Sequence, residues 1–86
     1  MPHICENRVL WKEKNGVVTV LLISSGNFFE FNAVGSAVWR LLAAGHSTDE
    51  IIDSLTKTYG VPREQLALDV HGFIVKMIAA DLLASD

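Results

Sequence analysis

The apolar residues of this 86-residue chain change their spacing at Asn32, and that change restricts the possible folds more than any other feature. Before Asn32, β-branched and aromatic residues dominate three short runs, at residues 9–11, 17–23 and 28–31. After it, apolar residues recur every three or four positions, which is the period of an amphipathic helix. The sequence therefore predicts strands in the first third of the chain and helices in the remainder.

The links between the three strands are short and rich in turn-forming residues. Asn15 and Gly16 separate the first two strands and supply the positive φ angles of a type I′ turn. Residues 24–27 separate the second and third, so both joints predict antiparallel hairpins, with the third strand at the edge of the sheet. The middle strand is apolar at successive positions. We therefore expect both of its faces to be covered, one by helices and the other by the N-terminal arm.

Three helical segments follow, and each has a residue suited to its boundary. The first begins at the capping residue Asn32 and ends at Gly45, and the second begins with a capping box at Ser47 and ends at Gly60. Pro62 fits the first turn of the third. The predicted fold is α+β and winged helix-turn-helix-like, with a three-stranded antiparallel sheet followed by three helices (βββααα). We expect residues 1–86 to form a single domain, because a chain of this size supports only one core.

Composition and charge exclude several classes of function. Seven Lys and Arg against ten Asp and Glu give a formal charge of −3, which disfavours nucleic acid as a partner. No apolar run approaches the roughly 18 residues of a membrane span, and the N-terminus lacks the order of a signal peptide. The single cysteine, Cys5, has no internal disulfide partner. We expect a cytoplasmic protein that binds neither nucleic acid nor membrane.

The residues that carry chemistry in enzymes do not cluster along the sequence. His3, His46 and His71 fall on different predicted elements, and no Cys, Asp or Glu lies near them at a metal-ligand spacing. Cys5 has no neighbouring Lys or Arg to favour its thiolate. The sequence therefore predicts a protein that is not an enzyme, with no catalytic residues, no metal and no cofactor.

The third strand, from Asn27 to Phe31, is the first candidate for a site. Phe29 and Phe31 point to one side of it, whereas Phe28 and Glu30 point to the other. Core packing accounts for Phe29 and Phe31, but Phe28 is as well suited to a surface as to a core. A strand at a sheet edge, unprotected by Pro or Lys, offers unpaired N–H and C=O groups to an extended peptide.

One edge of the third helix is the second candidate. Asp69, Phe73 and Lys76 lie along it, and they form either the rim of a groove or a solvated boundary. A second apolar line on this helix is either core beneath the N-terminal arm or an interface, and it comprises Leu68, Val75 and Leu82.

Three segments in this order resemble the PqqD-like family: residues 29–42, 47–52 and 69–74. The resemblance extends over about residues 8 to 83. Two positions depart from the family's pattern, which usually has Leu where Phe31 stands and Gly where Asp81 precedes the final apolar pair. These departures leave the expected fold unchanged.

The resemblance implies a recognition element for ribosomally synthesised and post-translationally modified peptides (RiPPs). Such a domain binds the leader segment of a precursor peptide and presents the rest to modifying enzymes, without being a catalyst. In the family the leader adds as a strand to the third β-strand and lies in a groove beside the third helix. The peptide-binding residues that this implies are Asn27, Phe28, Phe29, Glu30, Phe31, Asp69, Val70, Phe73, Lys76 and Met77.

The partners implied are a precursor peptide and a leader peptidase or another maturation enzyme. The chain is similar to the stand-alone recognition proteins of lasso-peptide clusters, which work with a leader peptidase and a cyclase. The alternative is a chaperone that carries the precursor of pyrroloquinoline quinone to a radical S-adenosylmethionine enzyme. A DNA-binding winged-helix regulator is a weaker alternative, because the third helix offers only Arg63, Gln65 and Lys76 for base contacts. In a leader complex, Lys76 or Arg63 would meet an acidic leader residue, and Asp69 or Glu30 a basic one.

Overall fold

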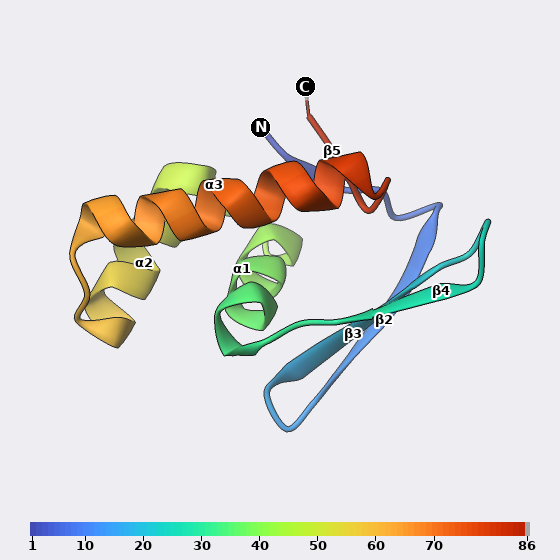
Figure 1. The fold of residues 1–86 in the computed structure, drawn as a ribbon, viewed down its shortest axis with the longest axis horizontal. Helices are drawn as coiled ribbons and strands as arrows, with labels where there is room; N and C mark the ends of the chain where they lie inside the picture. The colour runs from blue at the N-terminus through green and yellow to red at the C-terminus, as the bar shows by residue number, and fades with distance from the viewer. Residues whose placement is uncertain (86) are drawn as a thin grey trace.

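A computed structural model describes residues 1–85 of the chain. Its elements form two antiparallel sheets and three helices (Figure 1). In chain order they are β1 (His3–Ile4), β2 (Val9–Lys14), β3 (Val17–Leu22), β4 (Asn27–Glu30), α1 (Ala33–Ala43), α2 (Thr48–Tyr59), α3 (Arg63–Ala79) and β5 (Leu83–Ala84). The three predicted strands are β2, β3 and β4, so the α+β fold with three antiparallel strands before three helices is confirmed.

Strands β2, β3 and β4 form a meander in that order, with β4 at one edge. The β2–β3 turn has positive φ at both Asn15 (54°) and Gly16 (80°), as a type I′ turn requires. In the register, Leu21 of β3 pairs with Leu10 of β2 and with Phe28 of β4. Both predicted hairpins and the edge position of the third predicted strand are confirmed.

The helix boundaries follow the expected caps closely. The side chain of Asn32 accepts a hydrogen bond from the Gly35 N–H at 2.8 Å at the start of α1. Ser47 and Glu50 form the reciprocal capping box of α2, and Gly60 ends that helix in the left-handed conformation. Pro62 stands one residue before its expected place, as the cap of α3 rather than within its first turn.

The meander buries one face only. Val18, Val20 and Leu22 of β3 lie in the core beneath α1, whereas the alternate residues of β3 are only half-buried. The expectation that the N-terminal arm covers the other face is wrong. The arm instead forms β1, which pairs with β5 and lies against α1, because Ile4 has a buried site there opposite Leu83.

The β1–β5 pair brings the two ends of the described chain together at the end of α3 (Figure 1). Sequence reasoning missed both strands, since two residues are too few for a periodic pattern to show. It also placed Leu82 on a line along the third helix with Leu68 and Val75. The helix ends at Ala79, and Leu82 is fully buried while the other two are exposed, so that line does not exist as predicted.

A chain of aromatic contacts connects the sheet to α3 through the core. Trp39 of α1 is fully buried and lies 6.1 Å from Trp11 of β2, edge to face. Phe31 lies 5.5 Å from Trp39 on one side and 5.0 Å from Phe73 of α3 on the other, between ring centroids. Such ring pairs contribute about 0.5–1.5 kcal/mol each beyond their burial. The position of Phe73 is therefore coupled to the sheet through the buried Phe31.

Candidate functional site

The free edge of β4 carries backbone groups that the sheet does not use. Phe31 donates its N–H to the Val18 carbonyl at 3.0 Å, which identifies residues 31 and 18 as a hydrogen-bonded pair of the ladder. Hydrogen-bonded and non-hydrogen-bonded pairs alternate in an antiparallel ladder, so Phe28 and Glu30 belong to the second kind. Their N–H and C=O groups therefore point away from β3, towards the open edge.

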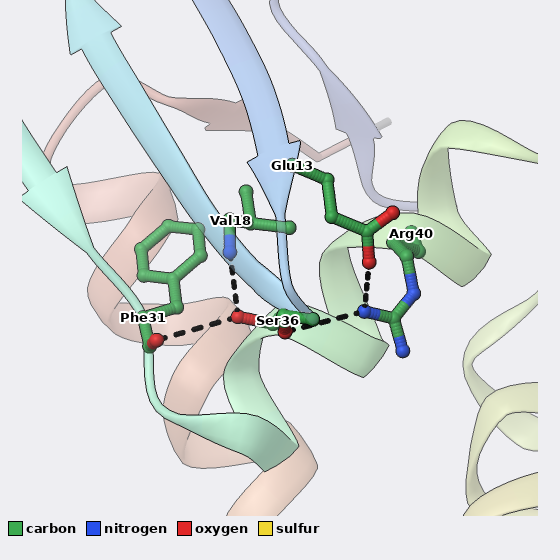
Figure 2. Close-up of polar contacts among 6 residues, drawn as sticks. Glu13, Val18, Phe31, Ser36 and Arg40 are labelled. Carbon is green, nitrogen blue, oxygen red and sulfur yellow. Dashed lines mark hydrogen bonds and ion pairs between the residues drawn. The ribbon is translucent and has the colours of Figure 1, made fainter.

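The end of β4 is fixed by the buried hydroxyl of Ser36. Its Oγ accepts a hydrogen bond from the Val18 N–H at 2.9 Å and donates one to the Phe31 carbonyl at 3.3 Å, so it bridges β3, β4 and α1 (Figure 2). Arg40 of α1 adds an ion pair to Glu13 of β2. These contacts attach the meander to α1 and fix the position of the chain where β4 leads into α1.

Helix α3 diverges from β4, and an open cleft lies between this helix and the start of α1. No Cα atom of β4 is within 8 Å of a Cα atom of α3. The cleft measures about 430 Å³. Its lining residues are Asn32, Val34, Gly35, Leu68, Asp69, Gly72, Phe73 and Lys76. The lining mixes polar side chains, Asp69 and Lys76 among them, with apolar ones such as Leu68 and Phe73.

The structure distributes the ten predicted peptide-binding residues over three degrees of exposure. Asn27, Phe28, Glu30, Asp69 and Lys76 are exposed, and Phe28 keeps 72% of its surface accessible. Three others are half-buried: Phe29, Phe73 and Met77. The last two, Phe31 and Val70, are 8% and 0% exposed. Val70 has no accessible surface and packs in the core on the buried side of α3. The ring of Phe31 packs against the ring of Phe73.

The charged residues that the sequence singled out on α3 lie in different places. Asp69 and Lys76 both line the cleft. Arg63, in contrast, pairs with Asp53 at 2.6 Å at the far end of α3 and does not line the cleft. Its guanidinium serves to join α2 to α3, so the suggestion that Arg63 meets an acidic leader residue is not supported.

Sequence reasoning proposed no site role for four of the cleft residues: Asn32, Val34, Gly35 and Gly72. It had placed the fifth, Leu68, on the second apolar line of the helix. One signal was present, because a glycine at position 72 interrupts an otherwise helical pattern and costs about 1 kcal/mol relative to alanine. A Cβ at this position would meet nothing within 4 Å, so packing within the chain does not require a glycine there.

Within residues 1–85, no group of three or more His, Cys, Asp or Glu side chains is placed to hold a metal ion. No helix in the same part of the chain is long and apolar enough to cross a membrane.

A three-stranded meander followed by three helices, with an open edge strand beside a cleft, defines a winged-helix-like α+β domain. A family model described as coenzyme PQQ synthesis protein D (PqqD) matches residues 18–83. The chain therefore belongs to the PqqD family, as its sequence segments indicated.

Two solved structures have the same fold over nearly the whole chain. One is TbiB1 in complex with the TbiA(beta) leader peptide, at 29% identity and a TM-score of 0.90, covering 98% of this chain and 99% of that one. The other is a lasso peptide synthetase B1 complexed with the leader peptide, at 17% identity and a TM-score of 0.88, covering 98% of both chains. The comparison with curated proteins found no match.

Proposed function

We propose that this protein is a RiPP recognition element that binds the leader segment of a precursor peptide. The leader adds as a strand to the free edge of β4 and lies against the cleft beside α3. One observation carries the proposal: β4 leaves an unpaired edge next to the Phe73 cleft, in a chain whose fold matches a leader-bound protein over 98% of its length.

Main-chain pairing provides binding that depends little on the leader's sequence. Phe28 and Glu30 each direct one donor and one acceptor to the open edge, so a leader strand gains up to four hydrogen bonds there. Each contributes about 0.5–1.5 kcal/mol net. Alternate leader side chains then face either the cleft or the outer face of the sheet, and the cleft side chains determine which precursor fits.

Apolar anchors supply the remaining affinity. A short leader loses conformational entropy on docking, which offsets about 2–5 kcal/mol of the gross interaction energy. The exposed ring of Phe28 and the half-buried ring of Phe73 both gain contacts when a strand is added between them. Ion pairs with Glu30, Asp69 or Lys76 contribute only about 0.2–1 kcal/mol each and mainly adjust the choice of precursor.

The bound leader delivers its precursor to modifying enzymes, and we infer that these are the leader peptidase and cyclase of lasso-peptide biosynthesis. Both solved relatives are leader-peptide complexes, and one of the two is a lasso peptide synthetase B1. The second candidate, delivery to a radical S-adenosylmethionine enzyme of pyrroloquinoline quinone biosynthesis, is favoured by the description of the matching family model. Measuring which purified enzyme forms a ternary complex with the chain and its leader distinguishes the two.

Fluorescence anisotropy with a labelled leader from the neighbouring precursor gene tests the proposal. We expect a dissociation constant in the nanomolar to micromolar range for the wild type. Phe28→Ala should weaken binding about tenfold, because its ring is an exposed anchor whose loss leaves the core intact. Tyr59→Ala is the matched control, since this aromatic residue is also exposed but lies at the end of α2. Absence of leader binding by the wild type contradicts the proposed function.

A further inference from the structure

Ser36 of α1 places a hydroxyl group in an apolar interior. Within residues 1–85 it is the one polar or charged residue that the fold buries, and it is 0% exposed. Asn32 already caps α1, and alanine is a better helix former than serine, so the helix itself does not require a serine there. A buried hydroxyl destabilises a fold unless it is hydrogen-bonded. The reason for this one therefore lies in the groups that it contacts.

The hydroxyl replaces one hydrogen bond of the sheet. Residues 18 and 31 are a hydrogen-bonded pair of the ladder, and two such residues ordinarily exchange both N–H···O bonds. Phe31 does donate its N–H to the Val18 carbonyl at 3.0 Å. The Val18 N–H, however, donates to Ser36 Oγ at 2.9 Å, and that hydroxyl donates to the Phe31 carbonyl at 3.3 Å (Figure 2). Helix α1 therefore inserts an oxygen atom into the pair at the end of the β3–β4 ladder.

Phe31, held in this way, forms the corner between β4 and the cleft. Its backbone follows Glu30, which directs its N–H and C=O to the open edge. Its ring lies 5.0 Å from the ring of Phe73, which lines the cleft. A Cβ on Gly35 would lie 2.9 Å from Phe73 and 3.2 Å from Phe31, so the first turn of α1 is close to both. The residue that Ser36 holds is thus connected to both parts of the proposed leader site.

The open edge of β4 and the cleft depend on this corner for their separation. No Cα atom of β4 is within 8 Å of a Cα atom of α3, whereas α1 contacts both β3 and α3. A leader strand needs the edge and the cleft at the same time, because its backbone pairs with the edge while alternate side chains enter the cleft. A binding site of this kind requires its parts to be held in place to within about 0.5 Å. A shift of Phe31 therefore changes leader binding, although Ser36 has no accessible surface with which to touch the leader.

We propose that the Ser36 hydroxyl is a positioning group for the leader site, an inference that rests on the proposed leader binding. It holds the edge of β4 and the Phe73 side of the cleft at the separation that one added strand requires. Without the hydroxyl, the Phe31 carbonyl moves towards the Val18 N–H to complete the ordinary pair of the ladder. The edge of β4 moves with it, so the leader loses either its backbone pairing or its contacts in the cleft.

Three substitutions of Ser36 test the hydroxyl by leader anisotropy. Ser36→Thr and Ser36→Val introduce β-branched side chains of nearly the same shape, and only the first keeps a hydroxyl. We expect Ser36→Val to bind leader about tenfold more weakly than Ser36→Thr, and Ser36→Ala about tenfold more weakly than the wild type. The comparison of Ser36→Thr with Ser36→Val decides the question where Ser36→Ala is too unstable to bind. In the protein without leader, the amide resonance of Glu30 should differ between Ser36→Thr and Ser36→Val.

A hydroxyl that serves stability alone predicts a different result. Its loss lowers the urea midpoint but leaves the leader affinity of the folded molecules unchanged. Ile52→Val is the control for this case, because it removes a buried methyl group from α2, a helix that does not contact the meander. It should lower the urea midpoint, keep the Glu30 resonance in place and leave leader affinity within about twofold of the wild type.

Two results overturn the inference. Equal leader affinity in Ser36→Thr and Ser36→Val shows that the hydroxyl does not position the site. Equal affinity in Ser36→Ala and Ile52→Val shows that it contributes to stability alone. Failure of the wild type to bind leader contradicts the proposed function itself, whereas leader binding by the wild type together with either of these results contradicts only the role of Ser36.

Discussion

Gly35 and Gly72 both line the cleft, but for opposite reasons. A Cβ on Gly35 would lie 2.9 Å from Cε1 of Phe73 and 3.2 Å from Cβ of Phe31, so only glycine lets Phe73 approach the start of α1. A Cβ on Gly72 would meet nothing within 4 Å. The first glycine is required by packing inside the chain, while the second leaves space that a ligand can use.

The two glycines give a matched pair of substitutions. Gly72→Ala should stabilise the protein by about 0.5–1 kcal/mol, because alanine loses less entropy in a helix. It should also weaken leader binding about tenfold, because its methyl group occupies part of the cleft. Gly35→Ala should destabilise the fold by about 1–3 kcal/mol, since Phe73 must move. Urea unfolding and leader anisotropy measure both, and unchanged leader affinity in Gly72→Ala would show that the leader does not enter this cleft.

Phe28 and Phe73, the two aromatic residues of the proposed leader site, differ in how far they are buried. Phe28 has no core contact to lose, whereas Phe73 packs 5.0 Å from Phe31. Truncation of Phe73 therefore removes core contacts as well as a leader anchor. Phe28→Ala is therefore a probe of binding alone, whereas Phe73→Ala also tests the core.

Strand β4 is short, yet its two edges have different roles. Phe29 directs its backbone groups to β3, and Phe28 and Glu30 direct theirs outwards. Just beyond the strand, Phe31 donates its N–H to the Val18 carbonyl, while its own carbonyl accepts from the Ser36 hydroxyl. Removing an outward N–H takes away a hydrogen-bond donor that an added strand could use. Removing an inward N–H breaks a hydrogen bond between β3 and β4.

Glu30→Pro uses this difference at the level of the strand. Proline removes the outward N–H of residue 30, and proline is tolerated at such edge positions. We expect leader affinity to fall about tenfold with the circular dichroism spectrum unchanged. Glu30→Ala, which keeps the N–H, is the control and should bind nearly as the wild type. Equal binding by Glu30→Pro and Glu30→Ala would argue against strand addition at this edge.

The capping box of α2 gives that helix a pH dependence. The hydrogen bond from the Ser47 backbone, followed by that from its side chain, lowers the pKa of Glu50, and His46 adds to the effect. A carboxylate whose pKa is lowered on folding stabilises the folded state above its unfolded pKa, and this contribution disappears as the pH falls through the folded pKa.

Glu50→Gln tests this contribution of charge at the start of α2. Glutamine still accepts the backbone hydrogen bond but has no charge to favour the helix N-terminus. We expect Glu50→Gln to melt slightly below the wild type at about pH 7, and the difference to shrink as the pH falls through the pKa of Glu50. Thermal melts over a series of decreasing pH values measure this. A difference that persists at low pH would show that hydrogen-bond geometry, rather than charge, is responsible.

At the scale of the molecule, the β1–β5 pair joins the two ends of the described chain to the core. Ile4 is 8% exposed and pairs with Leu83, and the N–H of Cys5 donates to the Leu82 carbonyl at 3.1 Å. This contact connects the residues before the meander to those after α3. The N-terminal arm is thus part of the core rather than a cover for the outer face of the sheet.

Ile4→Ala should therefore lower the stability of the whole protein by about 2–4 kcal/mol, because it removes buried methyl groups and leaves a cavity. Ile23→Ala is the matched control, since Ile23 is 52% exposed and should change stability by less than about 1 kcal/mol. Urea unfolding followed by circular dichroism measures both. Similar effects of the two substitutions would show that β1 contributes little to the core.

Local patterns in the sequence determine most of the elements of this protein. The strand runs, the type I′ turn, the caps at Asn32 and Ser47 and the glycine ends of α1 and α2 each depend on residues within four positions of one another. Backbone hydrogen bonds and turn geometry act over that distance, so sequence alone reveals them. The resemblance to the PqqD family extended this to the fold and to the strand and helix of the proposed site.

Only the tertiary structure decided which of those residues are accessible. It buried Phe31 and Val70 and left Phe28 exposed, brought Gly35 against Phe73, and placed the buried Ser36 hydroxyl between β3 and β4. It also paired β1 with β5 and left the outer face of the meander uncovered. These outcomes depend on contacts between segments far apart in the chain, where the packing of whole elements, rather than the spacing of neighbouring residues, determines burial.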